Sequence, residues 1–175
     1  MAVLRVRRYG DPVLRRRAQA VDTITPEIRR LVEDMTETMY DEVGIGLAAP
    51  QVGHSVRLLV VGDEEGRGVQ ALVNPVITES GGTVTAEEGC LSLPGIFADV
   101  ARAQWVKLEA HDLEGRPVAI TARGLRSRVF QHEIDHLDGV LFIDRLDAVT
   151  RDRIKRRIKK EGFSEDAAAH RAFAL

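Results

Sequence analysis

The sequence predicts an α+β fold, and two observations carry that prediction. Short apolar or alternating segments, typical of β-strands, gather between residues 57 and 122, whereas helical periodicity occurs near the start, around 124–139 and near the end. Strands grouped in this way favour α+β over a parallel sheet, which needs a helix between successive strands. There is no internal repeat and no linker-like composition, so we expect a single domain over residues 1–175.

The composition is that of an ordinary globular protein, with 44% hydrophobic and 30% charged residues. The formal charge of −2 gives no reason to expect DNA or an anionic membrane as a partner. The N-terminus lacks the apolar run of a signal peptide, and no apolar stretch approaches the roughly 20 residues that span a bilayer. Cys90 is the only cysteine, which excludes an intrachain disulfide and fits a reducing compartment. We expect a cytoplasmic protein.

The first clear helix is expected to begin at Thr25. This residue can cap the helix, Pro26 suits the first turn, and Glu27 complements the positive end of the helix dipole. Apolar residues then recur at helical period and predict one buried stripe: Ile28, Leu31, Val32, Met35 and Met39. The following segment, 44–53, combines glycines and alanines, which allow another backbone to approach closely.

The strands are expected in the middle of the chain. Alternating or apolar runs bounded by turn residues predict them at these positions: 57–61, 69–73, 76–78 after a break at Pro75, 83–86, 105–110 and 118–122. Residues 62–68 are rich in turn residues and charges, which predicts a hairpin loop between the first two strands. Residues 140–143 are expected to form a short strand or a turn.

A second helix is expected from about Gly124 to Gly139, and it carries the pattern HExxH. Residues four apart lie on the same helix face, so His132 and His136 can hold one metal ion. Glu133 can reach a water molecule bound to that metal. Gly139 is suited to end the helix, because glycine enters the left-handed conformation without strain.

Two histidines leave a metal short of ligands, since a catalytic site needs three from the protein and one open position. In one protease pattern a third histidine would stand where this chain has Phe142. Another protease class takes a glutamate from a later helix, where Glu161 is the only obvious candidate. Cys90 is the natural replacement, although a cysteine that follows glycine is more often buried and inert.

Three segments resemble the signatures of the peptide deformylases: residues 44–51 (GIGLAAPQ), 88–92 (EGCLS) and 131–136 (QHEIDH), in the family's order. The resemblance covers most of residues 1–160. It implies an enzyme that removes the N-formyl group from the initiator formyl-methionine of nascent polypeptides and releases formate. It also implies antiparallel β-sheets packed around a central helix that carries HExxH.

The resemblance implies a role for six residues by position. The implied metal ligands are Cys90, His132 and His136. Glu133 is the implied general acid/base, because metal-bound water must lose a proton to attack the formyl carbon. Gln51 and the backbone N–H of Leu91 would bind the formyl oxygen as negative charge develops on it.

Five further residues are candidates for binding the substrate peptide: Gly44, Ile45, Gly46, Leu125 and Val129. The glycines expose backbone to which an extended peptide can add as a strand. The apolar side chains can line a pocket for methionine, although core packing explains Leu125 and Val129 equally well. Arg128 is expected to point outward, and Asp135 to pair with Arg102.

Ligand type and the family resemblance favour different metals. One thiolate and two imidazoles favour Zn²⁺. The resemblance implies Fe²⁺ in the cell, with Ni²⁺ or Co²⁺ as working substitutes and Zn²⁺ often less active. We favour one divalent metal ion, Fe²⁺, for function.

A last helix is expected over about 148–160, capped by Asp147 or Thr150, and seven of the ten residues 151–160 are Arg or Lys. This run is either a solvated face or a contact with ribosomal RNA phosphates. Residues 162–175 are expected to be loosely ordered.

Two alternatives to a deformylase remain open at this point. One is a metallopeptidase. The other is a structural metal site with the basic helix as an RNA-binding surface. Glu133 argues against the second alternative, because a purely structural site has no use for a carboxylate beside its ligands.

Overall fold

The computed structural model describes residues 1–63, 65, 68–163 and 175. A five-stranded antiparallel sheet has the order β1-β2-β3-β6-β7 and contains β1 (Gly46–Ala48), β2 (Leu58–Gly62), β3 (Val69–Gly81), β6 (Trp105–His111) and β7 (Pro117–Arg123). A separate antiparallel hairpin contains β4 (Val84–Cys90) and β5 (Leu93–Arg102). The α-helices are α1 (Pro26–Asp41), α2 (Gly124–Leu137) and α3 (Ala148–Glu161). The predicted α+β class is confirmed.

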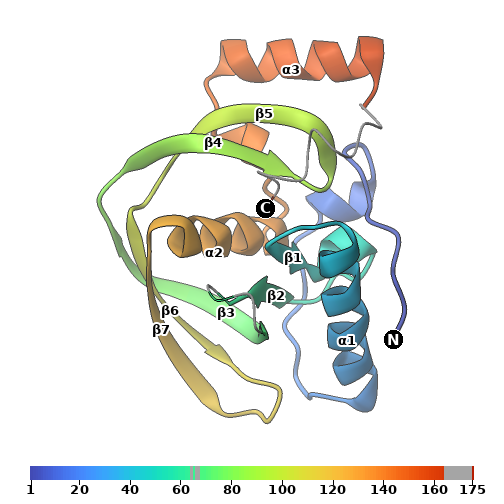
Figure 1. Cartoon of the computed structure of the whole chain (residues 1–175), viewed down its shortest axis with the longest axis vertical. Coiled ribbons are helices and arrows are strands. Elements are labelled where there is room, and N and C mark those ends of the chain that lie inside the picture. Colours follow the sequence, from blue (N-terminus) through green and yellow to red (C-terminus); the bar gives the residue numbers. More distant parts are fainter. Residues whose placement is uncertain (64, 66–67, 164–174) are drawn as a thin grey trace.

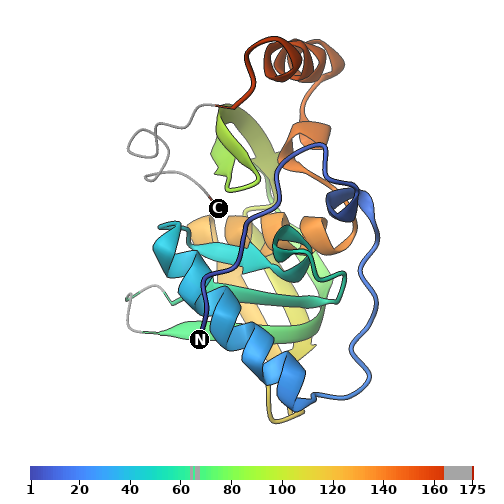
Figure 2. The same ribbon diagram turned by 90° about the vertical axis from the view of Figure 1, so that its right-hand side faces the viewer.

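Helix α2 lies between the two sheets, with the β4–β5 hairpin arching over it on one side and the larger sheet on the other (Figures 1 and 2). Strand β2 shows why the larger sheet is covered on both faces. Leu59 and Val61 pack in one core cluster with residues of α2, whereas Leu58 and Val60 pack in another with residues of α1. Side chains alternate across a strand, so an apolar run such as β2 can serve two helices at once.

The ends of the helices follow the sequence signals. The Thr25 side chain accepts a hydrogen bond from the backbone N–H of Ile28 at the start of α1. Helix α2 ends at Leu137, and Gly139 has a φ of +72°. A Cβ atom at position 139 would lie 2.5 Å from the backbone oxygen of Arg15, so glycine is required there for space as well as for conformation. The prediction that Gly139 ends the helix is confirmed.

One local prediction is wrong, and one strand was not expected. Strand β3 is continuous through Pro75, because an irregular register and a left-handed Asn74 (φ +52°) let the chain pass the missing N–H group. No strand was expected over the residues that form β5. Of the strand or turn expected at 140–143, the strand is not found, and the segment contains the start of a 3-10 helix, η3 (Phe142–Arg145).

The last helix has the predicted position, with the Asp147 side chain accepting from the N–H of Thr150. Ile154 is its buried residue and packs in a cluster with residues of β5 and η3. Residues 164–174 of the predicted loose tail lie outside the described residues. Leu175 is 3% exposed and donates its N–H to the Gly89 oxygen (3.3 Å), and the loose tail stays a prediction. In the described part of the chain, no helix combines the length and apolarity that crossing a bilayer requires.

Candidate active site

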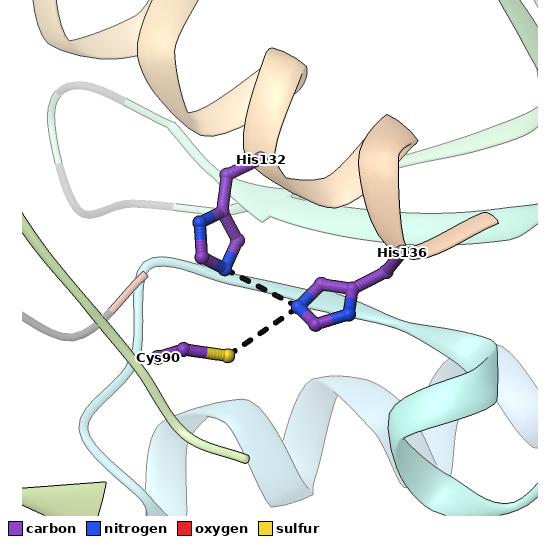
Figure 3. Close-up of side chains that lie close together, drawn as sticks. All are labelled: Cys90, His132 and His136. Carbon is purple, nitrogen blue, oxygen red and sulfur yellow. Dashed lines mark hydrogen bonds between the residues drawn. The ribbon is translucent and has the colours of Figure 1, made fainter. Parts of the chain in front are cut away.

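The three predicted metal ligands come from two elements and meet inside the molecule. Cys90 ends β4, and His132 and His136 lie on successive turns of α2 (Figure 3). The Nε2 atoms of the two histidines are 3.2 Å apart, and the Cys90 sulfur lies 3.4 Å from His136 Nε2. All three ligand atoms lie within 4.8 Å of one another, and all three residues are buried. This arrangement can hold one metal ion.

The ring of His132 is oriented by a carboxylate from β4. Its Nδ1 atom lies 3.0 Å from Oε1 of Glu88, so Nδ1 carries the proton and Nε2 is left to bind a metal. Glu88 is fully buried, and burial alone would raise its pKa. Hydrogen bonds from His132 and Arg102 outweigh that penalty and lower the pKa of Glu88 to about 2, which keeps it ionised.

Two arginines hold Glu88, and a wider charge network surrounds it. Arg102 donates from Nε to Oε2 of Glu88 (2.9 Å) and from Nη2 to Oε1 (3.0 Å), and Arg128 also donates to Oε2. Arg102 Nη1 donates to Asp135 (2.6 Å), which Arg145 also contacts. The predicted pairing of Asp135 with Arg102 is confirmed. The prediction that Arg128 points outward is wrong, because buried acceptors on the hairpin draw its side chain inward.

Glu133 is completely buried, and neither of its carboxylate oxygens has a hydrogen-bond partner among the described residues. Burial raises its pKa well above the usual range. Gly46 lies directly against it, since a Cβ atom at position 46 would be 2.9 Å from Glu133 Oε1. An unpartnered buried carboxylate next to a cluster of metal ligands is typical of a catalytic group rather than of a structural one.

Gln51 places an amide donor beside the ligand cluster. Its Oε1 atom accepts from the N–H of Ala48 (3.0 Å), which fixes the orientation of the amide. Its Nε2 atom therefore points towards Ser92 Oγ (3.2 Å) and the Cys90 sulfur (3.7 Å). Leu91 follows Cys90 at the turn between β4 and β5, and a Cβ atom on Gly44 would lie 2.9 Å from Cδ1 of Leu91.

Four of the five predicted peptide-binding residues line one cavity of about 380 Å³: Gly44, Ile45, Leu125 and Val129. The fifth, Gly46, lies between this cavity and Glu133, because a Cβ atom there would also be 3.0 Å from Val129. Core packing, the alternative interpretation, fits Val129, which is 2% exposed. It does not fit Leu125, which is 63% exposed at the mouth of the site.

The donor set fits a divalent metal. Burial lowers the pKa of His136 well below its usual value, so the imidazole is neutral, as a ligand must be. Burial and the nearby carboxylates of Glu133 and Glu88 raise the pKa of the Cys90 thiol to about 12. A thiolate in that setting requires a cation beside it, which a metal supplies.

Comparison with known proteins identifies the family. The sequence profile described as polypeptide deformylase matches residues 3–152. The chain belongs to the polypeptide deformylase family. It is 47% identical over 164 residues to a peptide deformylase of Syntrophobacter fumaroxidans, a match that covers 92% of this chain and 96% of the relative.

Solved deformylase structures share the fold. A peptide deformylase from Legionella pneumophila has a TM-score of 0.86 and 42% identity, and one from Thermus thermophilus has a TM-score of 0.85 and 49% identity. Each match covers 91% of this chain and 95% of the solved chain. The predicted family and enzyme class are confirmed. The single-domain assignment to residue 175 stays a prediction.

Sequence reasoning placed Glu88 in a deformylase signature without giving it a role. A signal for its role was present, because residues two apart in a strand share a face and Glu88 precedes Cys90 by two. Ser92, buried and bonded to Gln51, was missed in the same way. Arg128 carried no signal, since an arginine on a helix is usually solvated.

Proposed function

We propose that the protein removes the N-formyl group from the formyl-methionine of nascent polypeptides and releases formate. The single observation that carries this proposal is the meeting of Cys90, His132 and His136 beside the unpartnered carboxylate of Glu133. Family membership supports the same reaction. The cavity beside Gly44 supports a peptide substrate with an apolar first residue.

We propose Cys90, His132 and His136 as the ligands of one divalent metal ion. When bound, this ion supplies Lewis acidity, which lowers the pKa of water to about 7 and polarises a carbonyl group. Zn²⁺ suits a thiolate and two imidazoles, whereas the resemblance to deformylases favours Fe²⁺ in the cell. We propose Fe²⁺ as the functional metal, with Ni²⁺ and Co²⁺ as substitutes.

Glu133 is the proposed general acid/base. Its raised pKa and its unpartnered oxygens suit a group that takes a proton from the attacking water and delivers it to the departing amine nitrogen. Gly46 leaves the space in which Glu133 and the formyl group meet, because any side chain at position 46 would fill it.

Gln51 and the backbone N–H of Leu91 are the proposed donors to the formyl oxygen. The amide of Gln51 is held rigidly by Ala48, so no reorganisation is needed when negative charge develops. One such donor typically contributes about 3 kcal/mol to the stability of the transition state. Gly44, Ile45 and Gly46 offer the backbone along which the peptide would lie.

The basic helix α3 is a proposed contact with the ribosome. Its exposed face carries most of its cations, while Ile154 anchors the opposite face in the core. A cationic face of this kind favours binding to RNA phosphates in a way that salt weakens. The proposed compartment is the cytoplasm, where nascent chains are made.

A comparison of two blocked peptides tests the proposed function. The Fe²⁺-loaded protein, prepared without oxygen, is given formyl-Met-Ala-Ser or acetyl-Met-Ala-Ser, and release of the blocking acid is measured. The narrow space around Gly46 predicts fast formate release and little acetate release, because acetyl adds a methyl group at the reacting carbon. Equal release of the two acids would contradict the proposal.

A further inference from the structure

Arg128 joins the two parts of the molecule that supply the metal ligands. It lies on α2, one turn before His132, and its side chain is only 7% exposed. Its Nη1 atom donates to Glu88 Oε2 and to the backbone oxygen of Val100 (2.9 Å), and its Nη2 atom donates to the backbone oxygen of Val84 (2.7 Å). One guanidinium therefore contacts the backbone of both hairpin strands and the carboxylate of Glu88 on β4.

This connection matters because the ligand cluster has two origins. Cys90 belongs to the β4–β5 hairpin, whereas His132 and His136 belong to α2. The hairpin is a separate sheet and does not pack its backbone closely on α2 within the described residues. The distance between the thiolate and the imidazoles therefore depends on side chains that connect the hairpin to α2. A rigid, planar guanidinium suits such a connection.

The contacts of Glu88 show how Arg128 reaches the metal centre. Arg102 uses both oxygens of Glu88, and Arg128 adds a second donor to Oε2. Oε2 is thus held from two sides, which leaves Oε1 directed at His132 Nδ1 (3.0 Å). Without Arg128, Arg102 and His132 would be the remaining partners of Glu88, and Oε2 would keep one donor instead of two.

We propose that Arg128 is a positioning residue for the metal centre, which it orders by fixing Glu88 against His132 and the Cys90 hairpin against α2. The inference rests on the proposed metal site. Arg128 is not one of the proposed metal ligands or substrate-binding residues, and it acts through Glu88. Its loss is expected to weaken metal binding by 10-fold to 100-fold, the typical effect of removing a group that orients a ligand.

The charge balance predicts that the protein folds without Arg128. Glu88 and Asp135 keep Arg102 and Arg145 as cationic partners, so neither of these two carboxylates is left unpaired. Arg128→Met preserves the length of the aliphatic stem while removing every donor. Arg128→Lys keeps the charge but cannot reach three acceptors in a plane.

The experiment measures Co²⁺ affinity by competition with a chelator, together with the visible and thiolate charge-transfer spectrum of the Co²⁺ protein. Arg128→Met is expected to bind Co²⁺ at least about 10-fold more weakly and to show a shifted spectrum. The matched control is Arg126→Met. Arg126 lies on the same helix but contacts Gln70 and Phe130 instead of Glu88, so its loss should leave both readouts unchanged.

A double variant tests the route through Glu88. If Arg128 acts by orienting Glu88, then Glu88→Gln and Arg128→Met together should weaken Co²⁺ binding by less than the product of their separate effects. Should Arg128→Met not fold, Arg128→Lys takes its place under the same criteria.

Two results would overturn the inference. The first is an Arg128 variant that keeps the Co²⁺ affinity and the spectrum of the wild type. If its urea midpoint falls at the same time, Arg128 has a purely structural role. The second is a double variant whose effect equals the product of the single effects. Failure of the wild-type protein to bind Co²⁺ with a thiolate band would instead refute the proposed metal site itself, so the two failures are distinguishable.

Discussion

Gly46 lies against Glu133 so closely that the two positions constrain each other. A Cβ atom on Gly46 would be 2.9 Å from Oε1 and 3.0 Å from Cγ of Glu133. Glu133 is itself fully buried on α2 and has little room to retreat. Glycine at the start of β1 is therefore required by the side chains of Glu133 and Val129 rather than by the local backbone conformation.

Gly46→Ala is predicted to displace Glu133. A misplacement on the order of 1 Å can reduce the rate of an enzyme about 100-fold, and the overpacking should also cost roughly 1–3 kcal/mol of stability. Formate release at saturating formyl-Met-Ala-Ser and the urea midpoint measure the two effects. The matched control is Gly62→Ala, where an added Cβ would meet nothing closer than 3.8 Å. Equal rates in the two variants would show that Glu133 does not need this space.

Glu133→Gln is predicted to lose activity while keeping its metal. Glutamine has the same shape but cannot accept and return a proton, so the rate should fall at least about 100-fold. Metal content, measured by elemental analysis, should stay at the wild-type level because Glu133 is not a proposed ligand. Near-normal formate release by this variant would refute the proposed mechanism.

Cys90 is predicted to act as a ligand and not as a nucleophile. Cys90→Ser should lower metal content and activity together, because the soft thiolate is lost. Cys90→Asp should retain more metal than Cys90→Ala, since a carboxylate can still coordinate. The parallel between metal content and activity across the three variants is the quantity to measure. Full occupancy in Cys90→Ala would place the third ligand elsewhere.

Ribosome binding is predicted to depend on the exposed cations of α3. Four of them can be replaced by glutamine together: Arg153, Arg156, Lys159 and Lys160. Deleting the helix would instead expose the core beneath Ile154. Cosedimentation with ribosomes should weaken in the fourfold variant and, for the wild type, with rising salt. Activity on short peptides should persist. Unchanged cosedimentation would leave α3 as a solvated face.

The sequence predicts the fold well where one element contains its own signal. The cap at Thr25, the stripe of α1 and the end of α2 at Gly139 depend on local propensity, and all three are found. Strand β5 and the continuous β3 were not foreseen, because a proline within a strand is tolerated only through pairing and bulges that form in the folded sheet.

The residues of the site also differ in whether a local sequence signal predicts their position. The spacing of His132 and His136 follows from helix geometry, and their approach to Cys90 was expected from the resemblance. The inward course of Arg128 was not, because its acceptors are backbone oxygens of a hairpin that is distant in sequence. Contacts between elements of this kind have no local pattern in the sequence.

The products formed from formyl-Met-Ala-Ser separate a deformylase from a metallopeptidase in a single measurement. Formate and Met-Ala-Ser are quantified together with any formyl-Met, using metal-loaded wild-type protein. We expect formate and Met-Ala-Ser in equal amounts, because the tight contact of Gly46 with the buried Glu133 indicates a narrow space that suits a formyl group better than a residue on the acyl side. Formation of formyl-Met and Ala-Ser at a comparable rate would contradict it.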